Sequence, residues 1–457
     1  MNVLVKDKSF YKKMAVIAIP ISLQSMITIG VNMTDTVMVG KLGETSLSAT
    51  ALANQFVNIY QICCMGIAMG ASVLTSRFWG MQDITSLKKT ITLMLRLCIV
   101  LAVLFMLPTI LIPQLLMRMY TNDSAVIAQG VQYFKWMVYC YFLQGMTMTC
   151  TIVLRSVGQV NFPLFTSIGS FFVNILFNYM FIFGKLGVPR MEVEGAGVGT
   201  LIARVFEFSL ICGYFLFVDR KIGYRLKDLR MKCNSLIKDY VSISIPVFVS
   251  DSLLALGTSA VAMVMGRIGT GFVSANSITV VTQQLTTVVI QGICHASCIM
   301  TGHTLGQGER EKAQQQAWTF LILGLVVGIL GGGLIKVLSR SIIGLYNITP
   351  ETAQIAGELM DAIAFIVIFQ SMNSILTKGV LRGGGDTKFL MVADIIFLWA
   401  ASLPLGILAG LVWHLDAFWI YVFLKIDQIC KSIWCVFRLR SGKWIKTFSK
   451  EKMNHAK

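Results

Sequence analysis

The chain reads Ala18-Ile19-Pro20-Ile21 and then Gly40-Lys41-Leu42-Gly43, and 226 residues later it reads Ser244-Ile245-Pro246-Val247 and then Gly266-Arg267-Ile268-Gly269. The repeat continues with one added residue of offset, since Leu154-Arg155 corresponds to Leu381-Arg382. Both halves are strongly apolar. An internal repeat of this length is typical of membrane transporters in which a substrate site lies between two lobes.

The carboxylates do not follow this repeat. Asp35 in the first half corresponds to Val261, and Asp251 in the second half corresponds to Ser25. The scaffold is therefore duplicated while its acidic groups are not, and we expect the chemistry of the two halves to differ.

The composition is that of an integral membrane protein. Hydrophobic residues make up 55% of the 457 residues, charged residues only 13%, and the mean hydropathy is +0.72. Soluble domains carry about 25% charged residues. Each crossing needs about 20 apolar residues. The sequence therefore predicts twelve membrane spans near residues 14–40, 47–76, 90–112, 126–154, 162–184, 195–218, 237–264, 273–301, 313–338, 352–377, 388–412 and 418–437.

The expected fold class is an all-α integral membrane protein, with twelve transmembrane helices in two six-helix lobes related by internal duplication. Residues 1–218 form the predicted amino-terminal lobe and residues 237–437 the predicted carboxy-terminal lobe. A basic linker, 219–236, joins the lobes, and a basic tail, 438–457, follows them.

Loop charges predict the orientation in the membrane. Of the 39 Lys and Arg residues, 27 fall on the side of the two termini, and positive loops stay in the cytoplasm. We therefore expect a multi-pass protein of the plasma (inner) membrane with both termini, the linker and the tail cytoplasmic. The net charge of +17 is explained by this topology and by attraction to anionic lipids, so membrane lipids are expected partners and nucleic acid is not.

Motifs for enzymatic catalysis are missing from the sequence. It contains no phosphate loop of the GxxxxGK type, no HExxH pair and no nucleophile elbow. The four histidines are scattered, and His414 with Asp416 is a weak candidate for a membrane-embedded transferase. We expect no enzymatic activity and no cofactor, and transport driven by ATP would need a separate subunit.

Polar side chains inside the predicted spans point to an ion site in the first half. Asp35 lies well inside the first span, where a charged residue costs about 2.5–3.5 kcal/mol. Asn174 and Asn178 are four residues apart on one helix face, and Thr200 lies in the first turns of the sixth span. A carboxylate beside amide and hydroxyl oxygens can hold a proton or a small hard cation. Sodium at this cluster is the one metal that we expect.

Other intramembrane polar residues have alternative interpretations. Asp251 and Asp394, both in the second half, are candidates for substrate recognition. Amides such as Asn174 can also simply hydrogen-bond helices together. Two charged pairs have a spacing that neutralises charge within one helix and predicts structural ion pairs: Arg204 with Glu207, and Asp427 with Lys431.

Five stretches of the sequence together resemble one known family: Pro20 to Gly43 with Asp35, Pro246 to Gly269, Asn174 to Gly184, Gly195 to Thr200, and Leu381-Arg382-Gly383-Gly384-Gly385-Asp386-Thr387. They look like the multidrug and toxin extrusion (MATE) family of the multidrug/oligosaccharidyl-lipid/polysaccharide flippase superfamily. The resemblance runs from about residue 14 to Trp444. It implies a cation-coupled antiporter with two six-helix lobes.

The resemblance also implies residue roles. The family's cation site corresponds, residue by residue, to Asp35, Asn174, Asn178 and Thr200. Many archaeal and some bacterial members carry an acid where this chain has Asn178, so Asp35 is the only carboxylate of the cluster. This departure weighs against a proton relay of two carboxylates. Asp251 stands where many bacterial members carry an acid, whereas Ser371 replaces an acid of some sodium-coupled members, which makes a sodium site in the second lobe less secure.

The function implied is secondary active antiport. The chain would export organic, cationic amphiphilic compounds such as drugs, toxins or metabolites in exchange for protons or sodium, by alternating access and as a monomer. Pro20 offers a helix bend as a moving part, since proline removes a helix hydrogen bond. The alternative is a lipid-linked oligosaccharide flippase of the same superfamily, which the acidic and amide character of the exposed polar residues disfavours. The sequence specifies neither the substrate nor the coupling ion.

Overall fold

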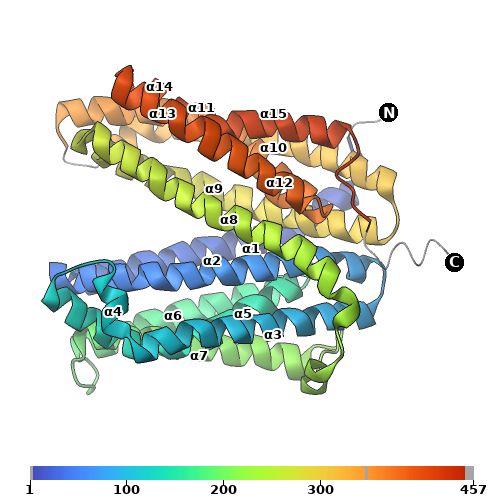
Figure 1. Cartoon of the computed structure of the whole chain (residues 1–457), viewed down its shortest axis with the longest axis horizontal. Coiled ribbons are helices and arrows are strands. Elements are labelled where there is room, and N and C mark those ends of the chain that lie inside the picture. The colour runs from blue at the N-terminus through green and yellow to red at the C-terminus, as the bar shows by residue number, and fades with distance from the viewer. Residues whose placement is uncertain (1–3, 345–347, 448–457) are drawn as a thin grey trace. The chain divides into compact units, whose positions relative to one another are not determined.

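A computed structural model describes residues 4–344 and 348–447, and all regular structure in these ranges is helical (Figure 1), which confirms the all-α fold class. The helices are α1 (Lys8–Gly40), α2 (Glu44–Gly80), α3 (Ile84–Leu111), α4 (Pro113–Arg118), α5 (Ser124–Ser156), α6 (Asn161–Phe183), α7 (Glu192–Gly213), η1 (Tyr214–Val218), η2 (Leu226–Arg230), α8 (Asn234–Ile268), α9 (Thr270–Gly306), α10 (Arg310–Ile343), α11 (Pro350–Ser374), η3 (Ile375–Leu381), α12 (Thr387–Asp394), η4 (Ile395–Ser402), α13 (Leu403–Ile407), η5 (Leu408–Val412), α14 (Ala417–Leu424) and α15 (Ile426–Arg440).

The helices coincide with the predicted spans, with two differences in detail. Ten helices or continuous helix runs in the described residues are long and apolar enough to cross a membrane. An eleventh, at the eighth predicted span, is a pair, Gly271–Gln284 and Thr286–Gly306, bent by 45°. The predicted single span at 418–437 is instead two helices, α14 and α15, separated at Lys425. Charged side chains, Lys425, Asp427 and Lys431, interrupt the apolar sequence there.

The helices form two compact units. The amino-side unit contains Leu23–Ser244, and the carboxy-side unit contains the described residues up to Ser22 and from Ile245 onward. Both α1 and α8 are continuous through the boundary, close to Pro20 and Pro246. The predicted lobes, 1–218 and 237–437, follow the sequence repeat and divide the chain between helices; that division stays a prediction.

The interior of the amino-side unit is built around aromatic side chains. Tyr60 of α2 and Tyr141 of α5 are fully buried, with ring centroids 5.0 Å apart, and the Tyr60 hydroxyl donates to the Tyr141 carbonyl at 2.5 Å. Gly145 allows this approach, because a Cβ there would lie 2.2 Å from the Tyr60 hydroxyl oxygen. In this unit α5 packs against α2, α3 and α7, and α7 packs against α6 (Figure 1).

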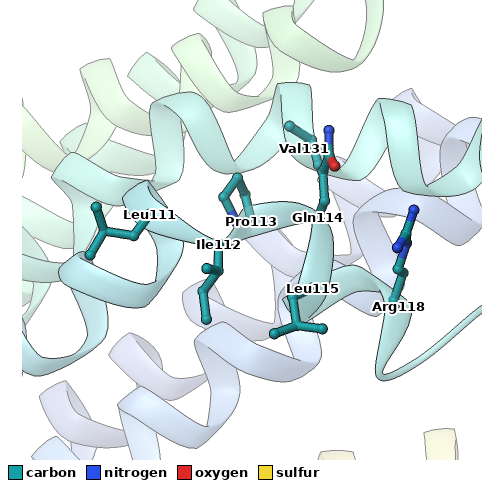
Figure 2. Close-up of a pocket in the computed structure, with 7 residues that line it drawn as sticks. All are labelled: Leu111, Ile112, Pro113, Gln114, Leu115, Arg118 and Val131. Carbon is teal, nitrogen blue, oxygen red and sulfur yellow. The ribbon is translucent and has the colours of Figure 1, made fainter.

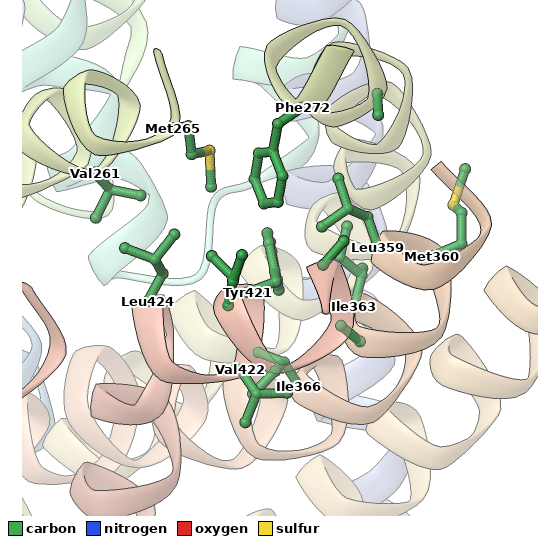
Figure 3. Close-up of a cluster of buried hydrophobic side chains, with 14 of the residues drawn as sticks. Val261, Met265, Phe272, Leu359, Met360, Ile363, Ile366, Tyr421, Val422 and Leu424 are labelled. Carbon is green, nitrogen blue, oxygen red and sulfur yellow. The ribbon is translucent and has the colours of Figure 1, made fainter. Parts of the chain in front are cut away.

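The interior of the carboxy-side unit is mostly aliphatic. Helix α11 packs against α9, α10, α14 and α15. A Cβ at Gly332 of α10 would lie 2.4 Å from the carbonyl oxygen of Ala364, and such close approach through small residues is typical of membrane helices. Figure 3 shows side chains of α8, α9, α11 and α14 in one buried cluster, which includes Val261, Met265, Phe272, Leu359, Ile363, Tyr421 and Leu424.

The predicted basic linker is anchored to α3 of the amino-side unit. Asp228 of η2 accepts a hydrogen bond from the backbone N–H of Arg225 and forms an ion pair with Lys88, both at 3.0 Å. Burial raises the pKa of Asp228, but the hydrogen bonds from Arg225 and Lys88 outweigh this effect and hold the pKa below its ordinary value. The linker therefore has a defined conformation despite its high charge.

The start of the predicted tail is packed into the carboxy-side unit. Trp444 is fully buried, and its indole N–H donates to Gln314 Oε1 of α10 at 2.7 Å. The indole lies directly on Gly384, where a Cβ would come within 2.3 Å of the ring. Asp386, two residues after Gly384, forms ion pairs with Arg438 at 2.6 Å and with Lys446 at 3.2 Å. The part of the predicted tail from 448 to 457 lies outside the described residues.

Candidate functional site

Three of the four residues predicted for the ion site meet inside the amino-side unit. Asn178 of α6 donates through Nδ2 to Asp35 Oδ1 of α1 at 2.6 Å and to Asn174 Oδ1 at 3.3 Å. Asn174 and Asn178 are 2% and 1% exposed, whereas Asp35 is half-buried. The one intramembrane carboxylate of this unit's first helix is therefore held by neutral amides.

The glycines of α7 explain how these helices come together. A Cβ at Gly199 would lie 2.1 Å from Asn178 Oδ1, and one at Gly195 would lie 2.5 Å from the carbonyl oxygen of Phe181. Helix α7 thus packs on α6 backbone to backbone, which only glycine permits at these positions. The Gly195-to-Thr200 stretch serves to place α7 against the Asn178 amide.

Thr200 is less closely joined to the cluster than the sequence suggests. It is half-buried on α7, one residue after Gly199. Among the hydrogen bonds of the described residues, none joins the Thr200 side chain to Asp35, Asn174 or Asn178. The geometry therefore unites three of the predicted ligands and leaves the fourth as a neighbour.

Two further side chains, Arg204 and Tyr133, lie near Asp35, and the sequence alone does not single them out for this site. Arg204 of α7 forms the predicted ion pair with Glu207 at 2.8 Å, which is confirmed, and it also interacts electrostatically with Asp35. Tyr133 of α5 is buried near Asp35, and its hydroxyl donates to Asn54 Oδ1 at 3.3 Å. No sequence spacing links Tyr133 to Asp35, because they lie on separate helices.

The cluster can respond to the protonation state of Asp35. The Nδ2 group of Asn178 is a donor, which suits an ionised carboxylate. Asn178 Oδ1 is buried and has no hydrogen-bond partner in the described residues, and an unsatisfied buried acceptor costs about 1–3 kcal/mol. A half-turn of the amide would present Oδ1 to Asp35, where it could accept from a protonated carboxyl or join the carboxylate in binding a cation. The amide therefore suits both a proton and a sodium ion.

The two candidate acids of the second half are each paired with a cation. Asp251 of α8 accepts from Arg382 Nη2 at 3.1 Å. Asp394 at the end of α12 accepts from Ser250 Oγ and, at 3.0 Å, from Lys431 Nζ. Lys431 also pairs with Asp427 at 3.0 Å, as predicted, and this second ion pair is confirmed.

The Asp394–Lys431 contact is a new feature. Lys431 is 2% exposed and lies between two carboxylates. Asp427 is on the same helix, whereas Asp394 is 37 positions earlier in the chain. The sequence makes Asp394 a candidate for substrate recognition, and the structure places its carboxylate in a buried ion pair.

Pro20 and His414, two further residues that the sequence singles out, lie inside a helix and in a loop, respectively. Pro20 lies inside α1, and the helix is continuous through it. His414 has a positive φ of 48° and precedes Asp416, the residue before α14. No group of three or more His, Cys, Asp or Glu side chains able to hold a metal ion occurs in residues 4–344 and 348–447.

A surface pocket of about 380 Å³ lies elsewhere in the amino-side unit (Figure 2). It is formed by the end of α3, the short α4 and one residue of α5, and it includes none of the predicted site residues. Its lining is Leu111, Ile112, Pro113, Gln114, Leu115, Arg118 and Val131.

Both halves of the chain match one protein-family model. The model of the MatE family matches residues 20–180 and 246–429. The chain is 24% identical over 419 residues to an uncharacterized transporter, YisQ, of Bacillus subtilis, with 90% of each chain covered. It is 23% identical over 441 residues to a probable multidrug resistance protein, NorM, of Thermotoga maritima, with 95% of this chain and 93% of the relative covered.

Solved structures share the fold. One is the MATE transporter VcmN of Vibrio cholerae in its bent form, with a TM-score of 0.86, 17% identity, and 96% of this chain and 99% of the other covered. Another is a MOP superfamily transporter from Pyrococcus furiosus, with a TM-score of 0.82, 19% identity, and 95% and 97% covered. At these identities the likeness concerns the fold, and it is consistent with two lobes of six helices.

Proposed function

The chain belongs to the MatE family of membrane transporters, and from this premise we propose that it exports organic, cationic amphiphilic compounds in exchange for protons or sodium ions. The observation that carries the proposal is the contact of Asp35 with the amide of Asn178. Several of its relatives are probable multidrug resistance proteins, which supports small-molecule efflux and does not favour the flippase alternative. No cofactor is needed for this activity.

The coupling step follows from the chemistry of the cluster. Asp35 would take up a cation in one state of the transporter and release it in the other, with the Asn178 amide presenting Nδ2 to the ionised form and Oδ1 to the occupied form. A bound ion shifts the balance between two states only by its different affinity for each. Asp35 is half-buried, so exchange with the surroundings needs no unfolding.

Protons are the favoured coupling ion. A single carboxylate is sufficient to carry a proton, and in the part of the chain that the structure describes Asp35 has no second acid among its hydrogen-bond partners. Sodium would need several oxygens, which Asp35 and Asn174 supply with Asn178 Oδ1, while further ligands would come from Thr200, backbone carbonyls or water. The proposal extends to a plasma-membrane monomer with cytoplasmic termini, as the loop charges indicate.

The test is efflux from proteoliposomes that contain the purified protein and a cationic dye. An imposed pH gradient without sodium, and then a sodium gradient at equal pH, separates the two ions. Asp35→Asn should abolish coupled efflux under either gradient, because it removes the only group of the cluster that can carry charge. Asp361→Asn is the matched control, since Asp361 is an exposed acid paired with Lys336.

Each outcome decides a part of the proposal. Efflux driven by sodium alone would overturn the preference for protons. Efflux driven by neither gradient would remove the antiporter assignment. Near-normal coupled efflux by the Asp35→Asn protein would remove Asp35 from the coupling site.

A further inference from the structure

The internal repeat places one arginine at corresponding positions in the two units, Arg155 and Arg382. Both occupy the end of a membrane helix, and each meets a side chain from the helix that opens its half of the repeat. In the carboxy-side unit this contact is a salt bridge: Arg382 Nη2 lies 3.1 Å from Asp251 Oδ1 of α8. Arg382 is therefore neutralised inside its own unit.

In the amino-side unit the equivalent contact has no negative charge. Arg155 Nη2 donates to Gln24 Oε1 of α1. The amide is fixed in this orientation, because its Nε2 donates to Ser167 Oγ at 2.8 Å and toward the Pro163 carbonyl at 3.5 Å, and a carbonyl can only accept. The oxygen of Gln24 must therefore face the guanidinium.

The charge of Arg155 is consequently left without a counter-ion. Arg382 forms an ion pair with Asp251, whereas no ion pair joins Arg155 to a carboxylate in the described residues. The Nε atoms of both arginines are buried without an acceptor, so the difference between the two units is the charge of the partner. A partly buried guanidinium that has no counter-ion is unfavourable, so an external anion there would be stabilising.

We propose that Arg155, held by Gln24, forms a binding site for a phosphate oxyanion. A guanidinium presents a planar fork of N–H donors that matches phosphate oxygens, and one amide oxygen occupies only part of that fork. Arg155 is half-buried at the last turn of α5, so its side chain is not sealed inside the unit. This is the end of the fourth predicted span on the side of the termini, where anionic lipid head groups gather. The phosphate comes from a lipid head group or from solution, and the site does not depend on the proposed transport activity.

The experiment measures ligand-dependent thermal stability of the full-length protein in detergent. One arm adds phosphatidylglycerol, with phosphatidylcholine of the same acyl chains as its control. The other arm adds inorganic phosphate, with chloride at equal ionic strength as its control. The variants are Arg155→Gln, which removes the guanidinium, and Gln24→Glu, which supplies an internal carboxylate of nearly the same shape. Arg190→Gln removes an exposed arginine, paired with Glu192, as a control for general loss of charge.

We expect at least one phosphate probe to stabilise the wild-type protein and the Arg190→Gln control, and to bind about tenfold or more weakly to both test variants. Phosphatidylglycerol acting alone identifies a lipid site, and inorganic phosphate acting as well identifies a general phosphate site. Equal binding by wild type and Gln24→Glu overturns the proposal, as does the absence of any phosphate effect on the wild type. Gln24→Glu retains the arginine, so it decides the matter even where Arg155→Gln does not fold.

Discussion

At the scale of single residues, Gly199 of α7 packs directly against Asn178 of α6. An added Cβ would be 2.1 Å from Asn178 Oδ1 and 2.8 Å from the Asn178 backbone nitrogen. Rotation of the Asn178 side chain can relieve the first contact but not the second. The spacing of α6 and α7 therefore depends on glycine at position 199, which has no Cβ. The hydrogen bond from Asn178 to Asp35 depends on this spacing in turn.

We accordingly expect Gly199→Ala to separate α6 from α7, lowering stability by about 1–3 kcal/mol and reducing coupled efflux. Gly213→Ala on the same helix is the control, because a Cβ there would meet no atom within 4 Å. Thermal unfolding in detergent and dye efflux from proteoliposomes measure the two effects. If the two alanine variants behave alike, close packing at Gly199 is not what positions the amide.

At the scale of an element, the segment after α15 is held by packing and by charge together. Trp444 fills the space above Gly384, and Asp386 binds both Arg438 and Lys446. The Lys446 backbone N–H also donates to the Gly384 carbonyl at 2.9 Å. These contacts tie the end of the described chain to the loop between η3 and α12. This loop contains the Gly383-to-Asp386 part of the motif that resembles the family.

Trp444→Ala should therefore destabilise the protein, by about 3–5 kcal/mol, since it removes a fully buried aromatic side chain. Trp413→Ala is the matched control, because Trp413 is 51% exposed. The measurement is the unfolding temperature of each purified variant. A drop no larger for Trp444→Ala than for Trp413→Ala would contradict the view that this segment is part of the fold.

At the scale of the whole molecule, the two units carry different electrostatics on a repeated scaffold. In the amino-side unit Asp35 is bonded by neutral amides, and Arg155 by a neutral amide. In the carboxy-side unit Asp251 and Asp394 are both bonded by cations. Only the first arrangement leaves an acid free to gain a cation without breaking an ion pair, which is why the proposed coupling site belongs there.

The orientation of the whole chain can be tested through the linker. A Lys227→Cys reporter in a cysteine-free background should resist a membrane-impermeant thiol reagent in intact cells and react after permeabilisation, because the basic linker is expected to be cytoplasmic. Lys227 is exposed, whereas the native Cys233 is 2% exposed and would be a poor reporter. Reaction in intact cells would invert the topology and the direction of export.

The sequence by itself determined the helical class, most of the helix positions and the contacts within single helices. Apolar runs long enough to cross a membrane must form helices, because only these satisfy their own backbone groups there. The ion pairs Arg204–Glu207 and Asp427–Lys431 follow from the helical repeat, which brings residues three or four apart together. The shared face of Asn174 and Asn178 follows in the same way.

Only the tertiary structure decided which helix faces meet. It joined Asn178 to Asp35, Lys431 to Asp394, and Arg155 to Gln24, and among the described residues it left Thr200 without a hydrogen bond to the other three predicted ligands. These contacts depend on how closely neighbouring helices approach and rotate, which small residues such as Gly199 control. Sequence spacing fixes geometry within about one turn of a helix, and beyond that range the partner of a side chain is set by packing.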